Sequence, residues 1–365
     1  MIKTEELIRY LEERFPLYLQ ESYDNSGLQI GNLEQEVKGV LVALDCTEAV
    51  VQEAVTTGCN TIITHHPLLF KGIKRIGTKS SIERIITACI KKDITLYAIH
   101  TNLDNHGEGV NKKICDRLGL SKTRALVPLR GSLYKLTVFT PMDSVEAVHE
   151  NLCAAGAGAI GNYYGCSFQS SGTGMFTPNE KANPTLGKAH IPERVEEMKM
   201  EYLVPKHLLG SALGAMRKSH PYEEVAHDLV LLENTDHNLG SGMIGELAEA
   251  MTEQSFLNTL KTTFKAGVIR STAPLGKPVK RVAVCGGSGS FLLTEAIQQG
   301  ADAFVSSDFK YHEFFGAEGR TLIADIGHYE SEQFTQELLL EIITEKFPTF
   351  AVRITEHNTN PINFL

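Results

Sequence analysis

The chain has 365 residues, and its 42% hydrophobic and 22% charged content is typical of a globular protein long enough for two domains. A net charge of -9 argues against sequence-independent binding to the phosphate backbone of a nucleic acid. The seven cysteines are an odd number without C-x-x-C spacing, and no apolar run is long enough to cross a membrane. We therefore expect a cytoplasmic protein without a membrane partner or a disulfide framework.

Strands alternate with helices in the first third of the chain. The sequence predicts strands at 39–45, 61–64 and 94–100, and helices at 47–57 and 82–92. Such alternation implies parallel pairing with right-handed crossovers, so the carboxyl ends of the three strands point the same way. Five polar residues end or follow these strands and should share one rim of the sheet: Asp45, His65, His66, His100 and Asp104.

Two adjacent histidines, His65 and His66, follow the apolar strand 61–64 and precede Pro67, which stops further ladder pairing. Such a strand end is the place where α/β sheets bind ligands. By itself the pair is equally consistent with a polar strand end, but two neighbouring imidazoles favour a metal site.

A matching pair lies near the C-terminus. Strand 321–325 leads into a helical pattern in which His328 and Glu332 are four residues apart and share one face. Such a pair alone also occurs on ordinary solvated helices. Together with the rim residues it completes a set of five candidate metal ligands: His65, His66, Asp104, His328 and Glu332.

The donor atoms of this set indicate which metals it suits. Nitrogen and oxygen donors without a thiolate fit Zn, Mn or Fe(II) better than Ca or Mg. Five protein ligands exceed the three of a typical catalytic zinc site and suit two ions that share one carboxylate. We therefore predict two divalent metal ions per chain, with zinc as the first choice and Mn or Fe as alternatives.

The middle of the chain has a different pattern. The sequence predicts six elements in the order βαββαβ, at 134–140, 144–155, 168–176, 195–203, 208–218 and 225–232. This order is the ferredoxin-like plan. Because candidate ligands lie on both sides of it, we predict a discontinuous, two-lobed α/β domain with parallel-rich sheets, formed by 1–128 and 238–365. Residues 129–237 would form an inserted ferredoxin-like α+β domain, with 234–238 as its exit linker.

A glycine-rich loop of Gly286, Gly287, Ser288 and Gly289 follows a predicted strand at 279–285 and precedes a predicted helix. Its backbone N–H groups could hold a phosphate, or the loop could be a tight packing turn. It matches neither the Walker loop nor the G-x-G-x-x-G pattern, so both interpretations stay open.

Asp308, Lys310 and His312 follow a predicted strand at 303–305. They could simply cap a helix and face solvent, or they could contact substrate and transfer protons. His100 could donate a hydrogen bond to a metal ligand or to bound water. We take these four residues as the catalytic candidates.

Several motifs together resemble the Nif-three-like dinuclear metal-centre family, also known as GTP cyclohydrolase I type 2 homologues. They are Tyr-Asp-Asn-Ser-Gly-Leu at 23–28, Thr-His-His-Pro at 64–67, His-Thr-Asn-Leu-Asp at 100–104, Ser-Ser-Asp-Phe-Lys at 306–310 and Gly-His-Tyr-Glu-Ser-Glu at 327–332. The middle segment, with His-Pro-Tyr-Glu-Glu at 220–224, resembles the PII-like insertion of the longer bacterial members. One departure is Tyr23, where a tryptophan is common.

The resemblance implies a toroidal homohexamer in which paired metals face an internal cavity. It places the metal ligands at the five positions named above, with Glu332 as the bridge. Two functions are consistent with it. The first is a cyclohydrolase-like, metal-dependent hydrolase of a nucleotide or phosphorylated small molecule. The second is a non-catalytic regulatory or assembly protein whose insertion senses a ligand or partner.

Overall fold

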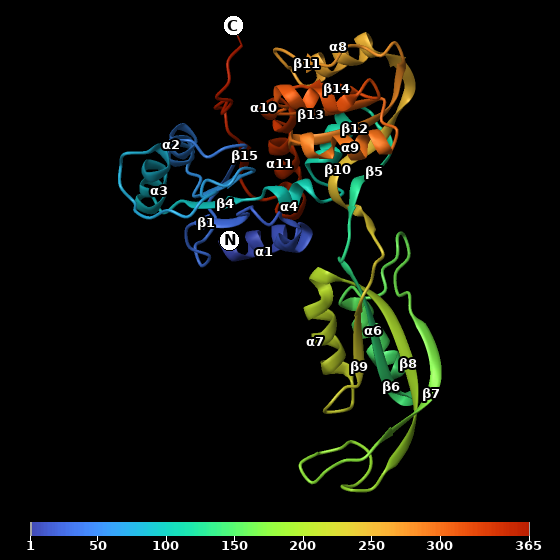
Figure 1. Ribbon diagram of the computed structural model, residues 1–365. Helices are drawn as coiled ribbons and strands as arrows, with labels where there is room; N and C mark the ends of the chain where they lie inside the picture. The colour runs from blue at the N-terminus through green and yellow to red at the C-terminus, as the bar shows by residue number, and fades with distance from the viewer. Residues whose placement is uncertain (1, 365) are drawn as a thin grey trace. The chain divides into compact units, whose positions relative to one another are not determined.

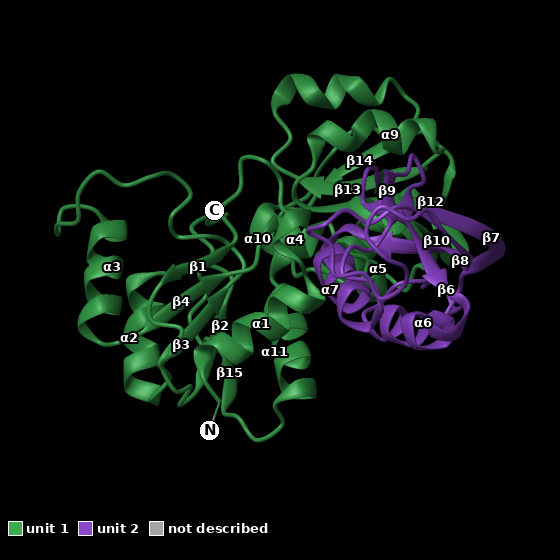
Figure 2. Cartoon of the chain, turned by 90° about the horizontal axis from the view of Figure 1, so that it is seen from below, with its two compact units in different colours: residues 1–128, 237–365 green, residues 129–236 purple. Residues whose placement is uncertain are grey.

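The computed structural model describes residues 2–364, and the chain divides into two compact units (Figure 2). Unit 1 comprises Met1–Pro128 and His237–Leu365, and unit 2 comprises Leu129–Asp236. The second boundary lies one residue before the predicted position. None of the helices in the described range is both long and apolar enough to span a membrane.

The first sheet of unit 1 has the strand order β1-β4-β3-β2-β15. Its strands are β1 (Gly27–Ile30), β2 (Val40–Ala43), β3 (Thr61–Thr64), β4 (Thr95–Ala98) and β15 (Val352–Ile354). All pairs are parallel except that of β1 with β4. Every residue of β2, β3 and β4 is buried, which explains their continuous apolar and β-branched sequences.

Two helices, α2 (Glu48–Thr57) and α3 (Ser81–Lys91), cover one face of this sheet (Figure 1). The α2 helix begins where the Thr47 side chain accepts a hydrogen bond from the Val50 N–H. It ends at Gly58, whose φ of 73° lies in the left-handed region that favours glycine. These caps lie where the sequence placed the ends of the predicted helix.

The second sheet of unit 1 has the order β11-β14-β13-β12-β10-β5. Its strands are β5 (Ser121–Leu129), β10 (Asp236–Thr252), β11 (Arg270–Ser271), β12 (Pro278–Ser288), β13 (Ala303–Ser307) and β14 (Leu322–Asp325). β12, β13 and β14 run parallel, whereas β10 and β11 pair in the antiparallel sense, so the sheet is mixed. The carboxyl ends of its parallel strands meet at one edge.

One large apolar core joins the two sheets of unit 1. It combines Val40 and Ile63 of the first sheet with Val282, Val305 and Leu322 of the second. The helices that contribute to this core are α1 (Thr4–Arg14), α5 (Val110–Arg117), α8 (Glu253–Thr263) and α11 (Thr335–Lys346). Burial of each large side chain stabilises the fold by roughly 1.5–3 kcal/mol. The shared core therefore holds the carboxyl ends of both sheets in a fixed relation.

The remaining helices of unit 1 are short. They are η1 (Leu17–Leu19), α4 (Thr101–Asp104), η4 (Ser290–Leu292), α9 (Leu293–Gln298), η5 (Tyr311–Ala317) and α10 (His328–Glu332). Of these, α4 follows strand β4 and α10 follows strand β14, and both helices carry candidate ligands.

Unit 2 contains a four-stranded antiparallel sheet with the order β7-β8-β6-β9. Its elements are β6 (Leu133–Pro141), η2 (Met142–Ser144), α6 (Val145–Ala154), β7 (Phe168–Phe176), β8 (Glu193–Pro205), η3 (Lys206–Leu208), α7 (Leu209–Ser219) and β9 (His227–Leu231). Alternate residues such as Met200, Tyr202 and Val204 pack against Val148 of α6 and Met216 of α7. The strands and the two α-helices follow in the predicted βαββαβ order.

The predicted exit linker 234–238 is partly wrong, because β10 already begins at Asp236. The polar composition of this segment predicted a loop. Its backbone instead enters a strand of 17 residues that crosses from the junction into the second sheet of unit 1. Pairing within a sheet can satisfy the backbone of a polar segment as well as solvent does.

Candidate metal centre

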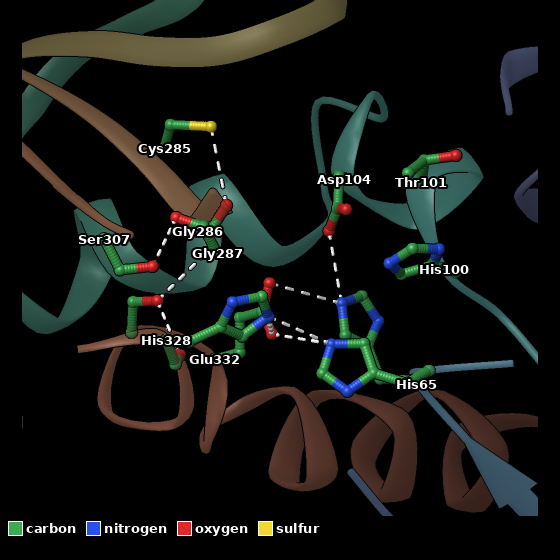
Figure 3. Close-up of polar contacts among 12 residues, drawn as sticks. His65, His100, Thr101, Asp104, Cys285, Gly286, Gly287, Ser307, His328 and Glu332 are labelled. Atoms are coloured by element: carbon green, nitrogen blue, oxygen red, sulfur yellow. Dashed lines mark hydrogen bonds and ion pairs between the residues drawn. The ribbon is translucent and has the colours of Figure 1, made fainter. Parts of the chain in front are cut away.

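His65 is fully buried where β3 ends, and one of its ring nitrogens has no hydrogen-bond partner. Its Nδ1 donates to the Ile99 carbonyl oxygen at 2.9 Å, so Nε2 carries the lone pair. That Nε2 lies 3.6 Å from Asp104 Oδ1 and 3.7 Å from Glu332 Oε1 (Figure 3). His65 Nε2 and Asp104 Oδ1 are both buried without a partner. Because each such atom costs about 1–3 kcal/mol, their convergence fits a bound cation.

His66 and His328 form a second group around the same glutamate. Their Nε2 atoms lie 3.0 and 3.1 Å from Glu332 Oε2, and 3.3 Å from each other. On the opposite side of each ring, Nδ1 of His66 donates to Asp45 at 2.7 Å and Nδ1 of His328 donates to Asp308 at 2.6 Å. A carboxylate on Nδ1 fixes the tautomer and orientation of a metal-binding histidine.

The spacing within this second group suits a metal ion. Ligand atoms at about 2.0–2.1 Å from a tetrahedral ion lie about 3.3 Å from one another. The nitrogen and oxygen atoms of His66, His328 and Glu332 are separated by 3.0–3.3 Å. This cluster could therefore hold a metal ion. We call His65, Asp104 and Glu332 Oε1 the first ligand group, and His66, His328 and Glu332 Oε2 the second ligand group.

The charges of the second ligand group balance one another. Burial opposes a charge on His66, but the carboxylates of Asp45 and Glu332 outweigh it and raise the pKa of His66 to about 10. Burial also opposes a charge on His328, where Glu332 and Asp308 raise the pKa to about 11. These imidazoles therefore hold protons at the positions where a metal ion would bind.

The charges of the first ligand group are not balanced in this way. Burial lowers the pKa of His65 and keeps this imidazole neutral. Burial, together with the nearby charge of Glu332, raises the pKa of Asp104 well above its ordinary value. Burial would do the same to Glu332, but the charge of His328 outweighs it and holds the pKa of Glu332 well below its ordinary value. The first group thus lacks the internal cations that the second group has.

The glycine loop packs closely against Glu332. A Cβ atom built on Gly287 would lie 2.3 Å from Glu332 Oε1, and φ at Gly287 is 63°. The N–H of Gly286 donates to Asn111 Oδ1, and that of Gly287 donates to Ser331 Oγ, each at 2.9 Å. Two of the backbone donors are therefore used within the protein, which favours the packing turn over the phosphate loop.

His100 lies beside both ligand groups. Its Nδ1 donates to Asp24 Oδ1 at 2.8 Å, and the N–H and hydroxyl of Thr101 donate to the other oxygen of Asp24. The ring centroid of His100 lies 5.2 Å from that of His65 and 5.4 Å from that of His66. Its remaining nitrogen is therefore available for proton transfer or for a metal.

The structure places the other catalytic candidates differently. Asp308 supports His328, as described above, whereas Lys310 and His312 do not border the cavity at the metal centre. Both are exposed, and the ring of His312 stacks on Phe315. The η5 helix begins at Tyr311 and carries its first turn along the surface. The predicted roles of Lys310 and His312 therefore have no support in their positions.

Two supporting residues, Asp24 and Asp45, were not identified as such from the sequence. Asp45 was expected on the rim without a role, and Asp24 was singled out only as part of the motif at 23–28 that carries the family resemblance. Neither is close to its histidine partner along the chain, since Asp45 precedes His66 by 21 residues and Asp24 precedes His100 by 76. A polar residue at the end of a strand next to β3 was the available signal for Asp45.

A cavity of about 380 Å³ opens at the two ligand groups. It is bordered by His66, Asp104, His328 and Glu332, and by Gly286 and Ser288 of the glycine loop. This volume is in the range of small-molecule sites. The predicted ligands thus lie beside a space that can admit a substrate.

Comparisons with known proteins agree over the length of the chain. The sequence model of a family described as Duf34/NIF3 (NGG1p interacting factor 3) matches residues 2–361. A Halalkalibacterium halodurans protein called GTP cyclohydrolase 1 type 2 homolog is 40% identical over 365 residues, which cover 98% of each chain. A Bacillus subtilis protein with the same name is 37% identical, with 100% of this chain and 99% of the other covered.

Solved structures give the same result. The crystal structure of a Bacillus cereus protein related to NIF3 has a TM-score of 0.88 at 39% identity, and covers 100% of this chain and 99% of its own. A Staphylococcus aureus protein has a TM-score of 0.79 at 31% identity, with the same coverage.

Proposed function

Because this chain belongs to the Duf34/NIF3 family, we propose that it is a metal-dependent hydrolase with two divalent ions per chain. Its substrate would be a nucleotide or another phosphorylated small molecule. The proposal is supported by the names of its relatives, which carry the term GTP cyclohydrolase 1 type 2 homolog. It is also supported by one feature of the site, the placement of different ligand atoms around each oxygen of Glu332.

The two oxygens of Glu332 lie near different histidine nitrogens. The proposal rests mainly on this observation. Oε1 lies near the unpartnered His65 Nε2, and Oε2 lies near the Nε2 atoms of His66 and His328. One carboxylate would thus bridge two ions, one in each ligand group. The mixture of nitrogen and oxygen donors favours zinc, with Mn and Fe as alternatives.

Bound metal ions would supply a more acidic water and would stabilise negative charge that develops on a substrate oxygen. The chain's own residues hold and orient the site. Asp45 and Asp308 fix the rings of His66 and His328, and Asp24 fixes the ring of His100. His100 would move a proton between water and substrate at the cavity. Lys310 and His312 have no part in this mechanism.

The number of protein donors leaves room for water. Counting Glu332 twice gives about six protein contacts, whereas two tetrahedral zinc ions need about eight. The open positions would face the cavity, as in catalytic zinc sites. His100 is the residue that could close one of them, because its ligand atom lies within 4.8 Å of those of His65 and His66. Even with His100 bound, one position would stay open for water; the alternative, a regulatory or assembly protein, requires a centre in which protein atoms fill both.

The family resemblance supports two further parts of the proposal. The chain would assemble as a toroidal homohexamer, and unit 2 would be a PII-like insertion that senses a ligand or partner. We also place the protein in the cytoplasm, which is supported by its seven free cysteines.

A screen of the zinc-loaded protein against nucleotides and phosphoesters tests the hydrolase. We expect release of product from at least one compound, and its loss on chelation and in His66→Ala. The control is His190→Ala, since His190 is exposed and lies in unit 2. Metal fully ligated by protein, with no exchangeable water, would contradict the hydrolase and favour the alternative.

A further inference from the structure

Three aromatic side chains border the cavity with much of their surface exposed. Tyr23 is 62% exposed, Phe70 is 45% exposed and Phe291 is 65% exposed. Single exposed apolar residues are common on protein surfaces, but three around one cavity are a group. They come from separate segments, the loop before β1, the loop after β3 and the η4 helix.

Two of these rings are continuous with the metal centre. The centroids of Tyr23 and Phe70 are 6.3 Å apart, and those of Phe70 and His100 are 6.2 Å apart. His100 in turn lies 5.4 Å from His66. A row of rings in tilted and edge-to-face contact therefore extends from the exposed Tyr23 to the ligands. A flat ring bound there would contact aromatic faces while its polar substituents reached the metals.

The charge at the cavity limits what else the ligand can carry. Among the described residues that border it, none is lysine or arginine, whereas Glu21, Asp104 and Glu332 are acidic. Two divalent ions would exceed these three carboxylates by about one positive charge, and one phosphate group carries about -1.5 to -2. The ions can thus offset half or more of the charge of a single phosphate, and every additional phosphate would face acidic walls without a lysine or arginine.

We propose that this cavity binds a flat heteroaromatic ring of the nucleobase class against Tyr23, Phe70 and Phe291. The same ligand carries at most one phosphate group, which faces the metal centre. This inference rests on the proposed function and narrows its substrate to a nucleoside or nucleoside monophosphate, in preference to a triphosphate. The closest basic side chains along the chain, Lys71, Lys74 and Arg75, follow Phe70 and do not border the cavity.

Calorimetric titration of the full-length, zinc-loaded protein tests both parts. The probes are guanosine and cytidine, their 5′-monophosphates and triphosphates, and ribose 5-phosphate. We expect at least one monophosphate to bind more tightly than its triphosphate, and about tenfold more tightly than ribose 5-phosphate, which has no ring to stack. Tighter binding of both triphosphates, or equal binding of ribose 5-phosphate, would overturn the proposal.

A pair of matched variants tests the aromatic contact. Phe291→Ala should weaken binding of the preferred nucleoside and of its monophosphate about tenfold, because stacking of one base on an aromatic side chain contributes about that much. Phe315→Ala is the control, since Phe315 is also 65% exposed but does not border the cavity. Zinc content and melting temperature should be unchanged in both. Equal binding by the two variants would overturn the proposal.

The outcome of these binding experiments can be distinguished from the outcome of the test for hydrolase activity. If neither nucleoside nor monophosphate binds while a phosphoester of the panel is still hydrolysed, the inference is overturned and the proposed function stands. If they bind as expected and nothing in the panel is hydrolysed, the aromatic subsite stands and the hydrolase does not.

Discussion

The two ligand groups of the metal centre share Glu332 but differ in how their buried charges are balanced. In the second group, each imidazole has a carboxylate on either side and holds a proton when no metal is present. In the first group, the buried His65 is neutral, and its Nε2 faces Asp104 with neither atom satisfied. The second group is therefore complete without a cation, and the first group is not.

This difference predicts an order of metal binding. An ion in the first group would satisfy two unpartnered atoms and would displace at most one proton, the one that burial favours on Asp104, because His65 is neutral. An ion in the second group would have to displace protons from His66 and His328, whose pKa values are raised. We therefore expect the first group to bind zinc more tightly at neutral pH.

The largest effect on zinc binding should come from Glu332→Gln, because Glu332 belongs to both ligand groups. The amide keeps the shape of the side chain and removes the shared negative charge. Zinc content measured by elemental analysis after reconstitution should fall from about two equivalents to fewer than one. Glu330→Gln is the matched control, since Glu330 is also buried in α10 but accepts a hydrogen bond from Asn360. Retention of two ions by Glu332→Gln would exclude the bridge.

Asp104→Asn should remove one ion and leave the other. Asp104 touches only the first group, so a zinc titration that shows a tighter and a weaker event should lose the tighter one. Calorimetry measures both events in one experiment. Loss of the weaker event, with the tighter one intact, would reverse the assignment of affinities to the two groups.

Asp308→Asn should have a smaller effect, confined to the second group. Asp308 accepts from His328 Nδ1 and does not reach the ion itself, and removal of such a support lowers metal affinity about 10–100-fold. The weaker zinc event should shift by that factor while the tighter one stays. Asp116→Asn, at an exposed carboxylate paired with Lys112, is the control. An equal shift of both events would show that the two groups are not separate.

The sequence could single out the five candidate ligands, which lie close together in the structure, because each lies next to a strong local signal. His65, His66 and Asp104 follow buried strands, and His328 and Glu332 share one face of a helix by spacing alone. Parallel pairing then requires the ends of neighbouring strands to meet. The predicted helix 47–57 agrees with α2 for the same reason, since its caps at Thr47 and Gly58 depend on adjacent residues.

The features that the sequence did not predict are contacts between distant segments and the direction of a short helix. The pairing of Asp24 with His100 and of Asp45 with His66 depends on tertiary structure that spacing does not encode. Lys310 and His312 follow a strand that does reach the site, but η5 turns them to the surface. Polar and titratable residues that follow a strand therefore need not belong to the site at its end.

The smallest effect on the two ligand groups is expected from removal of unit 2, because all of their residues lie in unit 1. The chain enters and leaves unit 2 at neighbouring points, where the Leu232 N–H donates to the Leu133 carbonyl oxygen at 3.0 Å. Residues 134–231 could thus be replaced by a two-residue glycine turn without stretching the chain.

The shortened protein should remain folded, because unit 2 has its own apolar core and unit 1 has the core that joins its two sheets. Both zinc events should keep their affinities, and Asp104→Asn in the shortened chain should still remove only the tighter one. Circular dichroism and calorimetry check folding and binding. A folded, shortened protein that has lost either event would mean that the ligand groups depend on the insertion, and that they are not built by unit 1 alone.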